Sequence, residues 1–190
     1  MKKIVLSLVS VLALSTTAFG EDTVEMNSIY IGIGAGQSYL ENKATDEAFT
    51  SAQTTLFVGY QPSKYAAFEA RYSFGMNDDY DSGSQKGIVL APESSISYWG
   101  LYLKPMYPIG NFNLYGLLGF GGEMLSDING GDAYQVSYHY GVGASYDFLE
   151  HFNVFVDYTC LLEDNQGFDY VATKDRWKSS AWTLGASYKF

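Results

Sequence analysis

The last twelve residues of the chain, 179–190, alternate between two kinds of side chain with a period of two. Every second residue, counted back from the C-terminus, is apolar or aromatic: Phe190, Tyr188, Ala186, Leu184 and Trp182. The residues between them are small or polar. A period of two is that of a β-strand, whose successive side chains point to opposite faces. One face suits hydrocarbon, which favours a transmembrane β-barrel over the alternative, a strand of a soluble β-sandwich.

The first twenty residues have the pattern of a secretory signal peptide. Lys2 and Lys3 precede a short apolar run, Ile4–Leu14, and small residues lead to Gly20. The run is too short for a membrane helix, which needs about 20 residues, and no other stretch is long enough. We therefore expect residues 1–20 to be removed and residues 21–190 to form one exported domain, either a soluble secreted protein or a barrel.

Composition narrows the classes of partner. The chain carries a net charge of −10, and loss of Lys2 and Lys3 with the leader would leave −12. This balance argues against a nucleic-acid partner. The chain contains 17 Tyr, 12 Phe and 20 Gly but only 4 Pro, which fits aromatic girdles and crowded glycine-rich strands. A single cysteine, Cys160, excludes an intramolecular disulfide.

The alternating pattern recurs in eight segments along the chain. They are residues 28–38, 52–60, 65–75, 93–104, 111–123, 135–148, 151–162 and 179–190. In the fifth segment both faces contain apolar residues, so its orientation stays open. Long polar connections at 39–51, 77–92, 126–132 and 163–178 alternate with short turns at 61–64, 105–110 and 148–150. An even strand count with alternating long loops and short turns predicts an all-β, eight-stranded antiparallel up-and-down transmembrane β-barrel, with both termini in the periplasm.

Several segments together resemble the OmpA/OmpX-type family of small outer-membrane barrels. The resemblance is carried by IYIGIGAGQSY, LFVGYQPSKYAAFEARYSF, NLYGLLGFGG, YHYGVGASYDFLEHFNVFVDY and WTLGASYKF. It implies a place in the outer membrane of a Gram-negative bacterium. It also implies a C-terminal signal for the barrel-assembly machinery, formed by Trp182, Leu184, Tyr188 and Phe190. Because no residue follows Phe190, we expect no peptidoglycan-binding domain.

Four charged residues fall on the inward face of the predicted strands: Glu69, Arg71, Lys104 and Asp157. An eight-stranded barrel is just wide enough to be filled by side chains. Buried charges must be paired and hydrogen-bonded, since each unpaired charge costs several kcal/mol. We therefore expect an interior ion-pair network that fills the barrel. The alternative is a gate, in which exchange of ion-pair partners opens a narrow channel.

Two loop segments carry further charged residues. Lys174, Arg176, Trp177 and Lys178 precede the last strand at the outer rim, where the bases could pair with lipopolysaccharide phosphates. The second segment, NDDYDSG at residues 77–83, has three aspartates. It lacks the full spacing of a calcium loop, so we expect solvated acids and no metal.

The sequence offers few candidates for catalysis. His139 and Ser137 share the inward face of the sixth segment, whereas outer-membrane enzymes that act on lipid place such a pair outward. No set of nucleophile, base and orienting residue is visible. The glycines of residues 32–36 follow G-x-G-x-G, not the dinucleotide spacing, and no helix pattern follows them. We expect neither an enzyme nor a bound cofactor.

The sequence therefore predicts a monomeric outer-membrane barrel with a structural or surface-interaction role, such as adhesion or immune evasion. Its extracellular loops would contact a host or surface ligand. Outer-membrane lipid, lipopolysaccharide and the barrel-assembly machinery are the other expected partners. The alternative function is a small gated pore through the barrel interior.

Overall fold

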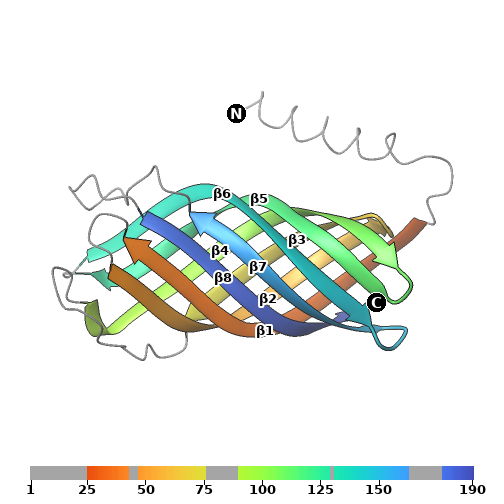
Figure 1. Cartoon of the computed structure of the whole chain (residues 1–190), viewed down its shortest axis with the longest axis horizontal. Helices are drawn as coiled ribbons and strands as arrows, with labels where there is room; N and C mark the ends of the chain where they lie inside the picture. Colours follow the sequence, from red (N-terminus) through yellow and green to blue (C-terminus); the bar gives the residue numbers. More distant parts are fainter. Residues whose placement is uncertain (1–24, 43–46, 76–89, 129–130, 163–176) are drawn as a thin grey trace, which may run out of the picture.

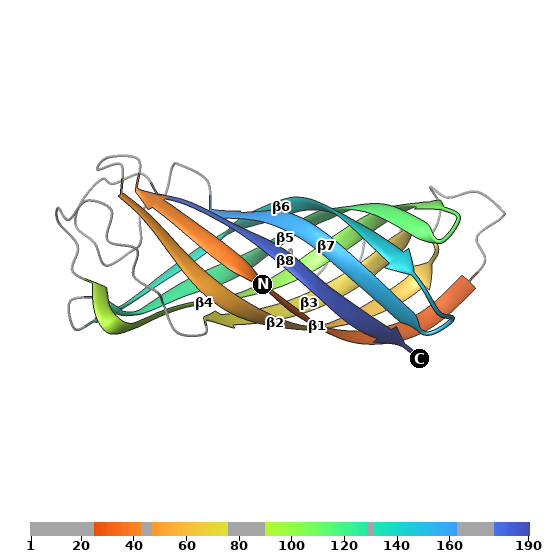
Figure 2. The same ribbon diagram turned by 60° about the horizontal axis from the view of Figure 1, so that its bottom comes forward.

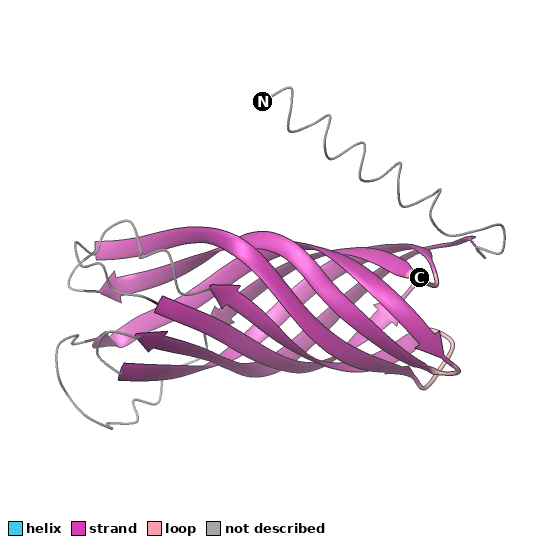
Figure 3. Cartoon of the chain, turned by 45° about the horizontal axis from the view of Figure 1, so that its top comes forward, coloured by secondary structure: helices cyan, strands magenta, loops and turns pink. Residues whose placement is uncertain are grey.

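Eight antiparallel strands form a closed barrel in the computed structural model, shown in Figure 1 and, turned by 60°, in Figure 2. The structure describes residues 25–42, 47–75, 90–128, 131–162 and 177–190. All regular elements in these ranges are strands (Figure 3), and none of these segments forms a helix long and apolar enough to span a membrane. The strands are β1 (Glu25–Asn42), β2 (Glu47–Ser63), β3 (Ala66–Gly75), β4 (Leu90–Ile109), β5 (Phe112–Ile128), β6 (Gly131–Asp147), β7 (Phe152–Leu162) and β8 (Trp177–Lys189).

Each strand pairs with its neighbours in sequence, and β8 pairs back onto β1 to close the ring. The closing register runs from Tyr30 opposite Lys189 to Asn42 opposite Trp177. Closure pairs the backbone groups of both terminal strands and leaves no open sheet edge. The predicted fold class, an eight-stranded up-and-down barrel, is therefore confirmed.

The two ends of the barrel differ. At the end that holds the C-terminus, the strands are joined through residues 64–65, 110–111 and 148–151; we call it the turn end (Figure 1). At the other end, the loop end, residues 43–46, 76–89, 129–130 and 163–176 join the strands and lie outside the described residues. Outer-membrane barrels place short turns in the periplasm and longer loops outside the cell.

The strands reach further toward the loop end than the sequence predicted. β1 and β2 stay paired as far as Asn42 opposite Glu47, and β5 and β6 as far as Ile128 opposite Gly131. The predicted loops at 39–51 and 126–132 are therefore wrong in their bounds. Polar side chains mark where a strand leaves hydrocarbon, but backbone pairing continues past that level because it does not depend on side-chain polarity.

Strands also replace two of the predicted turns at the turn end. β2 continues to Ser63 and β4 to Ile109, so the predicted turns at 61–64 and 105–110 are too long. Pro105 lies opposite Ala66, the first residue of β3, and Pro108 lies beyond the end of that strand. At Pro108 the pairing with β3 has ended, so a missing N–H on that side removes no ladder hydrogen bond.

The barrel wall has an apolar outer face and a mixed inner face. Outward residues along β1, such as Ile29, Ile31 and Ile33, are about half exposed, as hydrocarbon-facing side chains are in the absence of lipid. β5, whose orientation the sequence left open, turns Leu114 outward and Leu117 inward. The reason for its ambiguity is that its inner face carries leucine and tyrosine as well as glycine.

Glycines on the inner wall make room for aromatic rings from the neighbouring strand. A Cβ added at Gly59 of β2 would lie 2.0 Å from the ring of Tyr30 on β1, and one at Gly32 would lie 2.1 Å from the ring of Phe57. Any side chain at these two positions would displace a ring that fills the lumen. This local requirement explains why aromatic and glycine residues face one another across β1 and β2.

Candidate functional site: a buried ion cluster inside the barrel

Four charged side chains meet inside the barrel. Glu69 and Arg71 are two residues apart on β3 and therefore share its inner face, Lys104 comes from β4 and Asp157 from β7. All four residues are buried, with relative exposures between 3% and 8%. The structure thus brings together the four residues that the strand pattern placed in the interior. We call Glu69, Arg71, Lys104 and Asp157 the ion cluster.

Arg71 connects the two acids of the ion cluster. Its Nη1 and Nη2 atoms donate to Oδ1 and Oδ2 of Asp157 at 3.0 and 2.7 Å, and its Nε atom donates to Oε1 of Glu69. A guanidinium that donates two parallel hydrogen bonds to one carboxylate forms the strongest common type of ion pair. The side chains of all three residues are at most 2% exposed, so water does not weaken these bonds.

Lys104 and two tyrosines complete the bonding of the acids. The Lys104 ammonium donates to Oε2 of Glu69 at 3.2 Å and lies 4.0 Å from the ring centroid of Tyr115. The Tyr30 hydroxyl donates to Oε2 of Glu69 at 2.7 Å, and the Tyr115 hydroxyl donates to Oδ2 of Asp157 at 3.0 Å. Every carboxylate oxygen of the cluster therefore accepts at least one hydrogen bond.

The ion cluster is electrically balanced, with two acids and two bases. Burying an ion costs several kcal/mol, and only close pairing with further hydrogen bonds offsets that cost. Here the balance depends on every member, because Glu69 contacts both bases and Arg71 contacts both acids. Loss of a single member would leave an uncompensated charge in the barrel interior.

Sequence reasoning missed the aromatic part of this site. Rings from three strands surround the Arg71 guanidinium, with centroids 5.5–6.0 Å away: Phe57, Tyr102 and Phe155. Tyr30 could have been found, since it alternates with the outward isoleucines of β1. Tyr115 could not, because the facing of its strand was not decided by the sequence.

A second polar group lies in the interior, nearer the loop end. Glu123 of β5 accepts a hydrogen bond from the Ser179 hydroxyl through Oε1, and its Oε2 has no partner among the described residues. His139 of β6 is hydrogen-bonded through Nδ1 to the Tyr102 hydroxyl at 2.8 Å. The Nε2 atom of His139 has no hydrogen-bond partner among the described residues. Glu123 and His139 are 2% and 1% exposed. Unlike Glu69, Glu123 forms no ion pair with a described residue.

The pair of His139 and Ser137 does not form a catalytic arrangement. The Ser137 hydroxyl donates to the backbone carbonyl of Leu161, and the imidazole is bonded to Tyr102 instead. His139 is also buried, with a relative exposure of 1%. The inward orientation predicted for this pair agrees with its position on β6.

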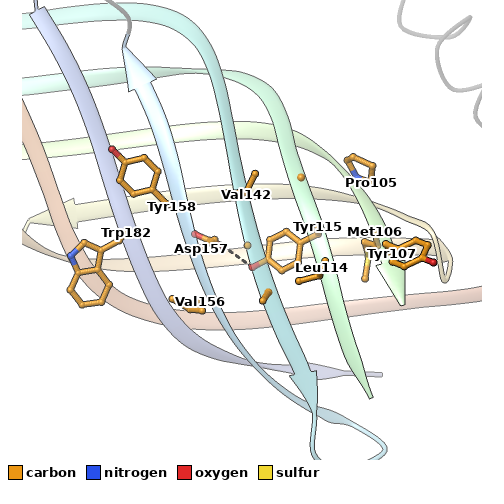
Figure 4. Close-up of a pocket in the computed structure, with 13 residues that line it drawn as sticks. Pro105, Met106, Tyr107, Leu114, Tyr115, Val142, Val156, Asp157, Tyr158 and Trp182 are labelled. Carbon is orange, nitrogen blue, oxygen red and sulfur yellow. Dashed lines mark hydrogen bonds between the residues drawn. The ribbon is translucent and has the colours of Figure 1, made fainter. Parts of the chain in front are cut away.

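Behind the ion cluster, the outer wall of the barrel is hollowed. Figure 4 shows the hollow, where Tyr158 and Trp182 lie on one side and Pro105 and Tyr107 on the other. Its volume is about 860 Å³, and its lining is predominantly apolar. The Tyr115–Asp157 hydrogen bond lies at its base. In a membrane such a surface faces lipid chains.

The comparisons with known proteins agree with this architecture. The model of the outer membrane protein beta-barrel domain matches residues 4–190, nearly the entire chain. The chain belongs to this family. It is therefore a protein of the bacterial outer membrane, as the terminal strand and the glycine-rich segments indicated. No curated protein matches the sequence.

Solved structures of small outer-membrane barrels show the same fold. Neisserial surface protein A has a TM-score of 0.61 at 14% identity, with 85% of this chain and 97% of that chain covered. The N-terminal barrel of Pseudomonas aeruginosa OprF has a TM-score of 0.58 at 14% identity, with 86% of this chain and 98% of that chain covered. The third structure is the attachment invasion locus protein Ail of Yersinia pestis, solved with the heparin analogue sucrose octasulfate. It has a TM-score of 0.56 at 20% identity, with 86% of this chain and 98% of that chain covered.

Of the four residues predicted to contact lipopolysaccharide, the structure describes only Trp177 and Lys178. Lys174 and Arg176 lie outside the described residues, as do the aspartates of residues 77–83 and the predicted signal peptide. Trp177 begins β8, and Lys178 is exposed and lies opposite Glu41 of β1. The contact with lipopolysaccharide stays a prediction.

The C-terminal strand of the outer-membrane barrel presents its apolar residues to the lipid side. Leu184, Tyr188 and Phe190 are 57%, 36% and 66% exposed. At the turn end the Tyr188 ring lies 5.0 Å from that of Phe152 and 5.1 Å from that of Phe190. The last strand therefore ends in a connected group of exposed aromatic rings.

Proposed function

We propose that this outer-membrane barrel is a surface-interaction protein, with a structural role in the membrane and a ligand-binding role at its loop end. The observation that supports this most is the closed interior. The Arg71–Asp157 ion pair crosses the lumen, and several side chains nearer the loop end are fully buried. Thr55, Ser73, Leu117 and Leu161 are each 0% exposed. An interior closed at the ion cluster leaves the loop end and the outer wall as the places where a partner outside the cell can bind.

The charge of the chain suggests the chemistry of the ligand. Residues 76–89 include Asp78, Asp79 and Asp81, and the whole chain has 21 acids against 11 bases. Ail was solved with a highly sulfated ligand. The acidic balance here disfavours such a polyanion and favours a basic protein surface, because unlike charges steer the encounter of two partners.

A loop-trimmed variant tests this role. Residues 76–89 and 163–176 would each be replaced by a short Gly/Ser turn, which leaves all eight strands intact. Bacteria that produce the full barrel are expected to adhere to cultured epithelial cells, and bacteria with the trimmed barrel are expected to lose adhesion. A shift in gel mobility between boiled and unboiled samples would establish that the trimmed barrel folds. Equal adhesion by both strains would contradict the proposal.

The other expected partners belong to the same proposal. Lys178 is available at the outer rim for a lipopolysaccharide phosphate, together with Lys174 and Arg176 from the adjoining segment. The C-terminal aromatic residues serve recognition by the barrel-assembly machinery. The closed ring needs no second copy to satisfy its edges, which favours a monomer. The buried, bonded state of His139 favours a role without catalysis.

A small gated pore is the second candidate, and one observation favours it. A polar cavity at the turn end leads to Lys104 of the ion cluster, so only the cluster and the packed layer beyond it separate that cavity from the loop end. Conductance of the refolded protein in a planar bilayer tests this function. Discrete openings that change in a Glu69→Ala/Asp157→Ala variant would support a gate at the cluster. A silent bilayer with folded protein would exclude it.

A further inference from the structure

The turn end of the barrel contains a cavity that reaches Lys104 of the ion cluster. Its volume is about 260 Å³, and it is more enclosed and more polar than the outer hollow. Since a water molecule occupies about 30 Å³, the space holds several waters or one small hydrated ion. Residues from seven strands and three turns line it. We call this cavity the vestibule.

Three lysines from different elements converge on the vestibule. Lys64 comes from the β2–β3 connection, Lys104 from β4 and Lys189 from the end of β8. The chain as a whole has only 11 basic residues against 21 acidic ones. The vestibule is lined by three lysines and two acids, Asp147 and Glu150. Basic residues therefore outnumber acidic ones there, whereas acids predominate in the chain as a whole.

Neither of the two acids is paired directly with these lysines. The Asp147 carboxylate accepts hydrogen bonds on both oxygens, from Asn113 at 3.1 Å and from Asn153 at 2.8 Å. Amide N–H groups directed at both oxygens also make Asp147 a poor cation ligand. Glu150 is an exposed residue of the β6–β7 turn. Neither acid forms an ion pair with a lysine in the described part of the chain.

The lysines keep hydrogen-bonding capacity. An ammonium has three N–H donors, and Lys104, which is 8% exposed, directs one of them to Glu69. Lys64 and Lys189 are half-buried and form no ion pair with a described residue. The buried side chain of Gln61 adds an amide to the same wall. Several donors from separate elements thus face one enclosed space.

We propose that the vestibule binds a small tetrahedral oxyanion of the phosphate class. Such an ion supplies a negative charge to Lys64 and Lys189, which form no ion pair with a described residue, and its several oxygens accept hydrogen bonds from donors on different walls, Lys104 among them. The vestibule lies at the turn end, which outer-membrane barrels place in the periplasm. The group comes either from a free ion in that compartment or from a phospholipid headgroup at the membrane rim.

An NMR titration of the refolded, isotope-labelled full chain in a phosphate-free, uncharged detergent tests the proposal. Inorganic phosphate is added at constant ionic strength, balanced with sodium chloride. We expect saturable shifts at the backbone amides of Gln61, Ser187 and Lys189, with loop-end amides unchanged. A second sample in nanodiscs that contain phosphatidylglycerol, without added phosphate, distinguishes the source. The same shifts there would assign the site to a headgroup.

A double variant and a matched control decide the outcome. Lys64→Gln/Lys189→Gln removes the two half-buried charges and leaves the ion cluster intact, and we expect it to weaken phosphate binding about tenfold, as the loss of two partly exposed ion pairs would. Lys178→Gln makes the same kind of change at the loop end and should leave binding unaltered. Shifts that do not saturate, or equal affinity in wild type and double variant, would overturn the proposal.

Discussion

Arg71 on β3 and Asp157 on β7 are joined across the width of the lumen by two parallel hydrogen bonds of 3.0 and 2.7 Å. In the ring β1 to β8, these strands are four apart in either direction, so the ion pair ties opposite walls together. Arg71 and Asp157 are 86 residues apart in the sequence. The pair thus acts at once on the stability of the barrel and on the closure of its interior.

Asp157→Ala should strongly destabilise the barrel. The change removes the acceptor for two Arg71 N–H groups and for the Tyr115 hydroxyl, and it leaves the buried cluster with one excess positive charge. We expect a loss of about 3–5 kcal/mol in the free energy of unfolding. Urea titration of the protein in lipid vesicles, followed by tryptophan fluorescence, measures it.

The control for this prediction replaces both partners. In Arg71→Met/Asp157→Leu the remaining Glu69 and Lys104 still neutralise one another. A buried ion pair exchanged for apolar residues of similar volume is often tolerated. The double variant should therefore lose less stability than Asp157→Ala alone. A double variant at least as unstable as the single one would contradict this explanation.

Gly59→Ala should disturb the ion cluster without touching a charge. The added Cβ would lie 2.0 Å from the ring of Tyr30, which must then move and release its 2.7 Å hydrogen bond to Glu69. Overpacking of this kind costs about 1–3 kcal/mol, measured by the same urea titration. Gly116→Ala is the matched control, because the nearest atom to its added Cβ would be Cγ of Pro105 at 3.4 Å, an ordinary contact distance.

A second-site change makes the Gly59 prediction sharper. If the ring of Tyr30 is the obstacle, Gly59→Ala should cost almost nothing in a Tyr30→Ala background. The two substitutions are then non-additive, as expected for residues in direct contact. Full additivity would show that Gly59 is needed for another reason.

Strand patterning predicted the inward position of the ion cluster because the outer face of each strand concerned is plainly apolar. In β3, the outward residues Phe68, Ala70, Tyr72 and Phe74 leave no doubt that Glu69 and Arg71 face inward. Alternation cannot give the partner of each charge, since that depends on how strands four apart are staggered. The bonds of Arg71 to Asp157, rather than to some other acid, could be learned only from the structure.

The facing of β5, the ends of β1 and β2, and the vestibule could not be predicted from hydrophobic alternation. β5 holds leucines on both faces, so the inward Tyr115 was not distinguishable from the outward Leu114. The ends of β1 and β2 were misplaced because hydropathy reports the boundary of the hydrocarbon, whereas the backbone remains paired to Asn42 and Glu47. The vestibule is lined by residues from seven strands and three turns, and they form no local sequence motif.

Phe190→Ala should impair assembly in cells but not folding in the test tube. Its ring is 66% exposed and contacts Tyr188, so its loss should change the stability of the folded barrel by only about 0.5 kcal/mol. If the ring belongs to a recognition signal, the amount of barrel in the outer membrane should fall severalfold. Leu149→Ala, an exposed apolar change at the same end but outside β8, should leave that amount unchanged. A comparable fall in both variants would point to general membrane anchoring instead.

Glu123→Gln should behave in the opposite way to Glu69→Gln. Glu69 is paired with Arg71 and Lys104, so its neutralisation leaves an excess positive charge and should cost about 3 kcal/mol. Glu123 is equally buried, but its one hydrogen bond with a described residue is accepted from the Ser179 hydroxyl, and an amide oxygen can accept that bond as well. At pH 9, where an ionised carboxylate without a cation is costly to bury, we expect Glu123→Gln to be neutral or stabilising. Urea titrations of both variants at that pH make the comparison, and a destabilised Glu123→Gln would mean that its charge has a partner beyond Ser179.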